Sequence, residues 1–394
     1  MEYSEKRLLD FSYADRTRRG RVDTSFAVLT LILLAVGVIM VLSASFARAY
    51  YDPDKKATYY FTRQLFFALS GCGIMYIASL VPIDFFKRWS FFILGGAAAM
   101  LLAVLVAGTE ANGARRWFAL GGVSFQPSEI AKLAVILFEA RLICAYRGKM
   151  HSFRYGVLPF ALIALLFVGL LVLEPHLSAS IIILGVTASM MFLGGTSMKW
   201  FFALGGAALG GLALMAFGMD YSSDRISAWL DPFADSSDTG YQIVQSLYSI
   251  GSGGLSGLGL GQSRQKNLYL PEEHNDFIFA VVCEELGFIG AAAILCLFAL
   301  LILRGFWLAM HCRDRYHLLV CAGISTLLAL QVILNVAVVT NLIPCTGISL
   351  PFFSYGGTAL WLQLGEMGII LSASRSVTGK INAGLRAPRG RDKE

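Results

Sequence analysis

Long apolar segments separated by short polar ones run along almost the whole chain. A stretch of about 20 mostly apolar residues is long enough to cross a membrane as a helix, because the hydrocarbon core is about 30 Å thick. The pattern predicts about ten such spans: 25–47, 62–81, 89–108, 128–145, 154–172, 177–195, 198–218, 276–303, 316–340 and 355–374. We therefore predict an all-α polytopic membrane protein.

The composition supports a membrane protein over a soluble one. Hydrophobic residues make up 56% of the chain and charged residues 15%, against roughly 45–50% and about 25% in soluble domains. The seven cysteines are odd in number and form no CxxC pair, so they indicate neither a disulfide framework nor a zinc site. The first apolar segment lacks a small-residue cleavage pattern and is expected to be a retained span.

The distribution of Lys and Arg predicts the orientation. With the N-terminus inside, 21 of the 32 basic residues fall in cytoplasmic segments and 8 in outer loops, as the positive-inside rule requires. We thus expect three parts: a cytoplasmic basic tail at 1–24, a transmembrane domain at 25–374, and a second cytoplasmic basic tail at 375–394. The modest net charge of +6 follows from this topology and gives no indication of nucleic-acid binding.

One loop is much longer than the others, at residues 219–275 between spans seven and eight. We place it on the outer face, where it is acidic by four charges. Its segment 241–250 has Ile243, Leu247 and Ile250 at helical spacing and predicts an interfacial helix. The glycine-rich run 251–261 suits either a flexible turn or one approached closely by other backbone. It completes no nucleotide-binding motif.

Charged residues within predicted spans mark candidate functional positions, because they are costly in lipid. Glu129, Lys132 and Glu139 share one helical face, although Lys132 could simply pair with Glu129. Asp276 opens span eight, where a helix N-cap is an alternative role. Glu284 and Glu285 lie about 12 Å deeper by helical rise, where hydrogen bonding within the bundle is an alternative.

Further polar groups converge on the outer leaflet from separate loops. Arg115, Arg116 and Trp117 precede Pro127, which suits the first turn of a helix. The Pro- and Gly-rich segment before the last span includes Ser354. A single His274 among acidic residues is a weak metal ligand without a second histidine at fixed spacing. This layout implies binding or chemistry at the outer surface and leaves enzyme, transporter and scaffold open.

Four motifs carry a resemblance to a known family: RRWFALGGVSFQPSEIAKLA (115–134), GYQIVQSLYSIGSGGLSGLGLGQS (240–263), LPEEHNDFIFAVVCEELGFIG (270–290) and TGISLPFFSYGGT (346–358). In this order they resemble the SEDS family (shape, elongation, division, sporulation). The residues of these motifs resemble the division and sporulation branch, FtsW and SpoVE, more than the elongation branch, RodA. The resemblance covers about residues 23–375.

The resemblance implies a peptidoglycan glycosyltransferase that polymerises lipid II at the outer face of the bacterial cytoplasmic membrane, in cell division or sporulation. Its expected partners are lipid II, undecaprenyl-pyrophosphate-linked glycan, membrane lipids and a class B penicillin-binding protein that crosslinks the strands. The family's catalytic acid corresponds to Asp276. Substrate binding is assigned to the following residues: Arg116, Trp117, Glu129, Lys132, Arg225, Gln245 and Ser354.

The implied chemistry suits these residue types. An inverting sugar transfer needs a base for the acceptor hydroxyl, which Asp276 would supply. It also needs positive charge for the departing pyrophosphate, which Arg116, Lys132 and Arg225 would supply. The acidity of the long loop opposes a dianionic leaving group, and a divalent cation, magnesium or manganese, would resolve that conflict.

Two other functions remain open. A lipid II flippase would use Lys132, Glu139 and Glu284 to line a headgroup path, although no matched pair of broken helices is evident. A non-catalytic scaffold for cell-wall enzymes is the second alternative, against which the intact Asp276 motif argues. The sequence departs from usual family choices at Asn341, Cys345, Gln363 and Glu366, positions that we expect to lie away from Asp276 and to affect partner contacts.

Overall fold

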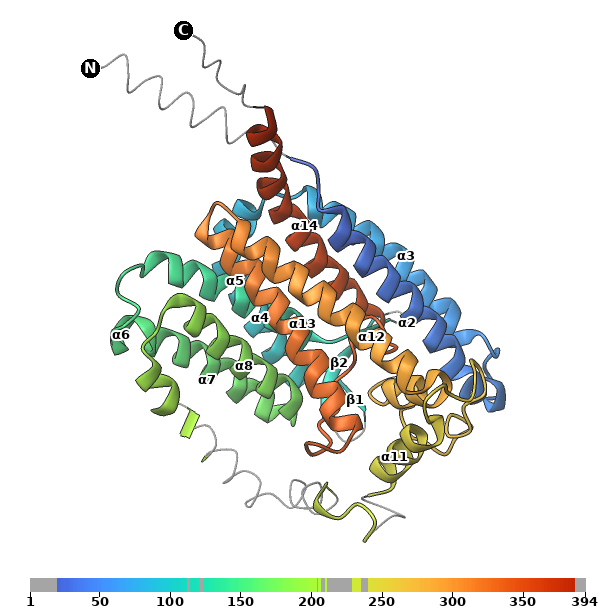
Figure 1. Ribbon diagram of the computed structural model, residues 1–394. Coiled ribbons are helices and arrows are strands. Elements are labelled where there is room, and N and C mark those ends of the chain that lie inside the picture. The colour runs from blue at the N-terminus through green and yellow to red at the C-terminus, as the bar shows by residue number, and fades with distance from the viewer. Residues whose placement is uncertain are drawn as a thin grey trace, which may run out of the picture.

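A computed structural model describes residues 20–111, 114–120, 123–203, 205–206, 210, 229–234 and 240–386. Its helices are α2 (Thr24–Tyr51), α3 (Tyr59–Leu80), α4 (Ile83–Ala107), α5 (Pro127–Ala145), α6 (Phe153–Gly156), α7 (Leu158–Leu173), α8 (Leu177–Gly194), α11 (Tyr241–Gly253), α12 (Ile278–His311), α13 (Arg315–Val339) and α14 (Gly357–Arg386). Figure 1 shows the helices packed as one bundle. The predicted helical membrane fold is therefore confirmed.

Seven helices within the described ranges are long and apolar enough to cross a membrane: α2, α3, α4, α6 with α7, α8, α12 and α13. Helices α5 and α14 also match predicted spans and pack among these seven, but they carry more polar residues. Most of the predicted span 198–218 lies outside the described residues. The number of ten spans thus stays a prediction.

The outward faces of the peripheral helices expose large apolar side chains. Leu69 of α3, Phe92 of α4 and Val106 of α4 are 67%, 66% and 83% exposed. So much exposed apolar surface would promote aggregation in water, whereas lipid covers it in a membrane. The exposed faces therefore support the multi-pass membrane assignment.

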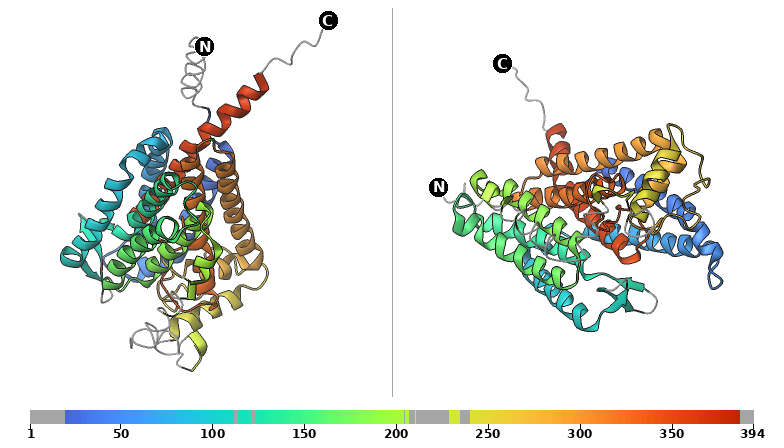
Figure 2. Two further views of the ribbon diagram at one scale, coloured as in Figure 1. Left: turned by 90° about the vertical axis from the view of Figure 1, so that its left-hand side faces the viewer. Right: turned by 90° about the horizontal axis from the view of Figure 1, so that it is seen from below.

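The two ends of the described chain meet at one end of the bundle. The amide of Gly20 donates to the carbonyl of Arg375 (3.1 Å), and the amide of Asp23 donates to Ser374 Oγ (2.9 Å). The last turns of α14 extend beyond the other helices (Figure 2). Helix α11 and the strands lie at the opposite end (Figure 1). This arrangement places both ends of the described chain on one side, as the charge distribution predicts.

A small antiparallel sheet interrupts the helical fold between α4 and α5. Its strands are β1 (Thr109–Ala111), β2 (Ala114–Leu120) and β3 (Val123–Phe125), in the order β1-β2-β3. These strands were not predicted, but they lie in the predicted loop between two spans and leave the mostly helical fold class in place. Strands this short show no alternation of apolar and polar residues, so only their mutual pairing defines them.

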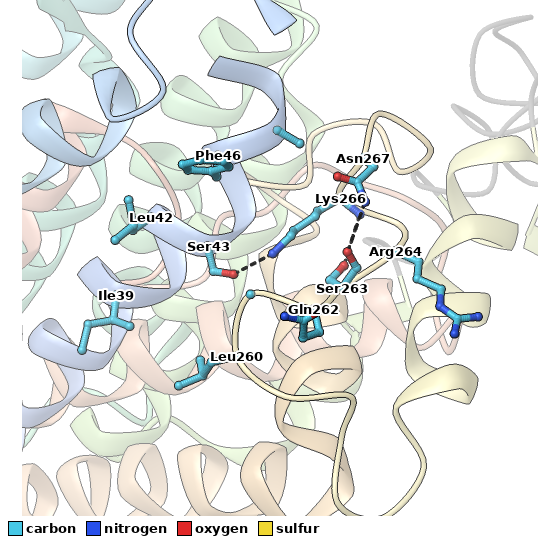
Figure 3. A pocket seen from close by; sticks show the side chains of 12 residues that line it. Ile39, Leu42, Ser43, Phe46, Leu260, Gln262, Ser263, Arg264, Lys266 and Asn267 are labelled. Carbon is cyan, nitrogen blue, oxygen red and sulfur yellow. Dashed lines mark hydrogen bonds between the residues drawn. The ribbon is translucent and has the colours of Figure 1, made fainter. Parts of the chain in front are cut away.

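The predicted interfacial helix is present as α11, and the chain that follows it packs against α12. The carboxylate of Glu284 accepts hydrogen bonds from Ser263 Oγ (2.5 Å) and the Arg264 amide (2.9 Å). The carboxylate of Glu285 accepts from Lys266 Nζ and Ser43 Oγ, both at 2.7 Å. Figure 3 shows the Ser43–Lys266 bond beside a cavity that is lined by α2 and by residues 260–267. Glu284 and Glu285 therefore bind the bundle together, which was their alternative role.

The glycine run permits close backbone approach to a break in α12. Gly287 has φ 65° and ψ −172° inside the helix, and a Cβ there would lie 2.2 Å from the amide nitrogen of Gly257. A Cβ on Gly257 would in turn lie 2.2 Å from the carbonyl oxygen of Glu285. The close turn, not the flexible one, is thus the correct interpretation of this glycine run.

We expect Gly287→Ala to destabilise the protein. The added Cβ collides with backbone and the left-handed φ disfavours alanine, a strain on the order of 1–3 kcal/mol before any rearrangement. The measurement is the melting temperature of the purified protein in detergent. Gly95→Ala is the matched control, because a Cβ on Gly95 of α4 meets nothing within 4 Å. Equal melting temperatures for the two variants would contradict the close packing.

Candidate active site

A polar cavity of about 690 Å³ opens at the end of the bundle that carries the strands. It is lined by the start of α3, strands β2 and β3, the start of α5, the start of α8, and the loops before α12 and α14. Its charged lining consists of Lys55, Arg63, Arg116, Lys132, Glu129, Glu272 and Asp276. The cavity thus carries four cationic and three acidic side chains, although the long loop is acidic.

Asp276 lines this cavity just before α12 begins. The N-cap residue of α12 is Phe277, without a side-chain cap, so the N-cap alternative for Asp276 is wrong. A Cβ added to Gly347, which has φ 69°, would lie 3.1 Å from Asp276 Oδ2. The carboxylate therefore lies against the turn that precedes α14.

Two polar side chains, the buried Asn335 and the partly buried Ser354, hold the backbone around Asp276. Asn335 of α13 donates through Nδ2 to the carbonyls of Asp276 (2.8 Å) and Ile348 (2.7 Å). Ser354 Oγ donates to the Asn275 carbonyl (2.8 Å) and accepts from the Leu350 amide (2.7 Å). Ser354 lines the cavity as predicted, and its hydroxyl also fixes the loop that carries the acid.

We expect Asn335→Leu to reduce catalysis more than it reduces stability. The two carbonyls that lose their donor are part of the cavity wall, and an unsatisfied buried group costs about 1–3 kcal/mol. Polymer synthesis and melting temperature of the same preparation are the measurements. The comparison variant is Gln331→Leu, one turn earlier on α13. Gln331 also lines the cavity but does not donate to the carbonyls of Asp276 and Ile348. Equal effects of the two variants on synthesis would contradict a special positioning role for Asn335.

Arg116 and Trp117 reach the cavity from β2. Arg116 Nε donates to the carbonyl of Glu174 (2.9 Å), and its Nη2 donates to the carbonyl of Pro175. The guanidinium thereby joins the sheet to the turn between α7 and α8. Arg116 has a positioning contact in addition to its predicted place in the site.

Glu129 and Lys132 form an ion pair in the wall of the cavity, with Lys132 Nζ 2.7 Å from Glu129 Oε2. Both side chains are buried, at 9% and 3% exposure. Glu139 lies apart from them and accepts a hydrogen bond from Thr187 Oγ1 of α8 (2.8 Å). The shared face of α5 is thus confirmed as buried, and the alternative pairing of Lys132 with Glu129 is present.

The acidic segment before Asp276 is fixed by α2 and α3. Arg48 Nε lies 2.8 Å from Glu273 Oε1. Burial alone would raise the pKa of Glu273, but its contacts with His274 and Arg48 outweigh burial and lower the pKa. His274 packs against the rings of Tyr60 and Tyr355, at 4.7 and 5.8 Å between ring centroids. These ring contacts hold His274 in place, and its weak metal-ligand role stays a hypothesis.

The other predicted residues differ in whether they line the cavity. Gln245 lies on α11 and is not among the residues that line the cavity. Arg225 lies outside the described residues. Gln363, expected to lie away from Asp276, lines the same cavity, which corrects that expectation. Gln363 Oε1 accepts a hydrogen bond from the Phe352 amide (3.0 Å). The start of the last span is therefore part of the site.

Sequence reasoning missed one wall of the site. The start of α3 contributes Tyr59, Tyr60 and Arg63, of which Arg63 lies about one helical turn after the two tyrosines. Arg63 lies within a predicted span, and a charge at such a position is itself a functional indication. That signal was available without the structure.

The site and fold together define a class of protein: a multi-pass helical membrane protein with a charged cavity at one end of its bundle. The family model for cell cycle proteins, which covers FtsW, RodA and SpoVE, matches residues 23–379. The chain therefore belongs to the SEDS family, as its motifs predict.

Individual relatives agree over almost the full length. The chain is 40% identical to stage V sporulation protein E of Bacillus subtilis (strain 168), over 91% of this chain and 98% of that protein. It is 38% identical to a probable peptidoglycan glycosyltransferase FtsW of Geobacter sp. (strain M18), over 91% and 98%.

Two solved structures share the fold. One is that of a peptidoglycan synthase complex studied for the coordination of polymerization and crosslinking, at TM-score 0.74 and 30% identity, covering 90% of this chain and 98% of that one. The other is the rod shape determining protein RodA of Thermus thermophilus, at TM-score 0.67 and 29% identity, covering 90% and 97%.

Proposed function

We propose that this peptidoglycan glycosyltransferase polymerises lipid II into glycan strands, in division or sporulation, with Asp276 as the general base. The family and the relatives named glycosyltransferases support the polymerase activity. The observation that carries the catalytic assignment is that Asp276 shares one cavity with Arg63, Arg116 and Lys132. That cavity combines a proton acceptor with positive charge.

The reaction follows from this combination. The Asp276 carboxylate takes the proton of the acceptor's 4-hydroxyl on GlcNAc, and the oxygen attacks the anomeric carbon of the lipid-linked donor. The bond from that carbon to the pyrophosphate oxygen breaks, and undecaprenyl pyrophosphate leaves with the electron pair. The cations stabilise the negative charge that develops on it. The four cations of the lining offset the acidity that the long loop suggests.

We place the cavity at the extracytoplasmic side of the bacterial cytoplasmic membrane. The cavity lies at the end of the bundle away from the Gly20–Arg375 contact. The two predicted basic tails adjoin that contact, and basic segments favour the cytoplasmic side. The substrate's lipid tail would then lie along the outer leaflet while its headgroup enters the cavity.

A class B penicillin-binding protein is the proposed partner. The structural neighbour is described as a peptidoglycan synthase complex that coordinates polymerization and crosslinking, and a polymerase that releases strands gains from an adjacent transpeptidase. The decisive experiment is polymerisation of labelled lipid II by the purified chain, with and without this partner. Absence of glycan strands under both conditions would overturn the proposed function.

A divalent cation, magnesium or manganese, could be held in the cavity by two carboxylates together with substrate phosphates. In the part of the chain that the structure describes, no three His, Cys, Asp or Glu side chains come together as a metal site. Glu272 and Asp276 do line the same cavity, and magnesium is commonly held by one or two carboxylates together with substrate phosphates. When bound, such an ion would neutralise pyrophosphate charge.

We expect chelation to test this ion directly. Treatment with EDTA should lower strand synthesis by about tenfold or more, and added magnesium or manganese should restore it, because the ion stabilises leaving-group charge. Potassium chloride added to the same ionic strength is the control, because EDTA does not bind potassium appreciably. Unchanged synthesis after exhaustive chelation would exclude the ion.

A flippase and a scaffold remain the alternatives. The polar groups that would line a flippase's path have partners elsewhere: Glu139 bonds Thr187, and Glu284 bonds the Ser263 loop. The charged cavity around Asp276 has no purpose in a silent scaffold. Both observations favour the polymerase, and the variant of Asp276 described in the Discussion separates the functions.

A further inference from the structure

The turn between α7 and α8 holds a second group of buried polar side chains, of which His176 lines the cavity. His176, the N-cap residue of α8, lines the cavity and is 8% exposed. Its Nδ1 is buried without a hydrogen-bond partner, and so are both carboxylate oxygens of Glu174, which is 1% exposed. Buried polar atoms are nearly always hydrogen-bonded, so such unpaired atoms beside a cavity indicate a ligand or an ordered water.

The backbone of this turn is already held, which leaves only side-chain atoms for a ligand. The His176 amide donates to the Leu171 carbonyl (2.8 Å), and the His176 carbonyl accepts from the Ser180 amide (3.3 Å). Ser178 Oγ donates to the carbonyl of Thr346, next to the Gly347 turn that flanks Asp276. His176 is therefore fixed in the same wall as the general base.

The surroundings keep the imidazole of His176 neutral. Burial, followed by the positive charges of Arg116 and Lys132, lowers the pKa of His176 to about 3. A neutral imidazole offers one hydrogen-bond donor and one acceptor and carries no charge. Hydroxyl and acetamido groups also both donate and accept, whereas a pyrophosphate only accepts and is better matched by the two cations.

We propose that His176 forms a subsite that recognises an uncharged hydroxyl or acetamido group on the first sugar of the lipid-linked substrate. In such a substrate the sugar is bonded directly to the pyrophosphate. A side chain beside the cations that hold the pyrophosphate is therefore well placed for the sugar. This inference rests on the proposed function for the identity of the ligand.

Binding measurements separate sugar recognition from pyrophosphate recognition. The full chain carrying Asp276→Asn, which does not consume lipid II under the proposed mechanism, is compared with and without His176→Leu in lipid nanodiscs. The two probes are lipid II and undecaprenyl pyrophosphate, which lacks the sugars. We expect His176→Leu to raise the Kd of lipid II by about tenfold, the effect of one lost hydrogen bond, and to leave that of undecaprenyl pyrophosphate unchanged.

Further variants keep the test decisive. His176→Gln should retain part of the lipid II affinity, because an amide also donates and accepts, and His176→Ala replaces the leucine variant if that one does not fold. His317→Leu, a histidine on α13 outside the cavity, is the matched control and should bind both lipids as the parent does.

Other results would overturn the inference. A parallel loss of affinity for both lipids would assign His176 to the pyrophosphate, and no loss for either would remove it from the site. Equal affinity of the parent for the two lipids would show that no sugar is recognised. The proposed function fails by a different result, which is the absence of strand synthesis by the unmodified chain.

Discussion

Asp276→Asn should abolish nearly all strand synthesis while the protein stays folded. The substitution keeps the size of the side chain and leaves the carbonyl of Asp276 bonded to Asn335. It removes proton acceptance together with the negative charge of the carboxylate. General-base catalysis contributes about 10²–10⁴-fold, so we expect polymer output from lipid II to fall by at least about 10²-fold. The measurement is glycan-strand length and amount on a gel.

A matched control isolates the carboxylate from the general loss of a negative charge. Asp54→Asn removes one acidic charge from the exposed loop between α2 and α3, at the same end of the bundle, from a residue that does not line the cavity. It should leave synthesis close to that of the unmodified chain. If Asp276→Asn synthesises strands at the same rate as this control, Asp276 has no part in the mechanism.

The same variant separates polymerase from flippase. Moving a headgroup across a membrane needs no base, so any exposure of lipid II at the far leaflet should survive in Asp276→Asn. Reconstituted liposomes allow strand synthesis and headgroup exposure to be followed in parallel. If Asp276→Asn lost headgroup exposure but kept strand synthesis, the flippase would be favoured over the polymerase as the function of Asp276.

Topology and motifs predict that Asp276, Arg116 and Lys132 lie on one side of the bundle, and all three line the same cavity. Arg116 and Lys132 come from one motif and Asp276 from a distant one, and each precedes or begins a span on the same face. Once the spans were assigned, their convergence followed. The sequence says less about residues on long connections, such as Gln245, because no repeating pattern fixes which face of an amphipathic helix meets the cavity.

Other features needed three-dimensional packing. The roles of Glu284 and Glu285 depend on the Ser263–Lys266 segment, which packs against α12 although it lies about 20 residues earlier in the chain. The same close packing explains why Gly257 and Gly287 occur together. The role of Asn335 as a donor to two carbonyls depends on the geometry of α13 and does not follow from the sequence.

Lys132→Met should weaken catalysis strongly while the protein stays folded in detergent. Lys132 lines the cavity that holds Asp276, and we expect it to stabilise the pyrophosphate that leaves. Removal of one such electrostatic contact costs on the order of 2–4 kcal/mol in the transition state, which corresponds to about 30- to 1,000-fold in rate. Strand synthesis and melting temperature are measured on the same preparation.

The ion pair with Glu129 makes a second variant necessary. Lys132→Met leaves the Glu129 carboxylate buried beside an apolar side chain, and an unpaired buried charge destabilises a protein. Combining Lys132→Met with Glu129→Gln removes that charge and should recover the melting temperature. If Lys132 acts on the leaving group, the double variant stays inactive, because no cation has been returned to the cavity. Recovery of synthesis together with stability would instead assign Lys132 to the structural pairing alone.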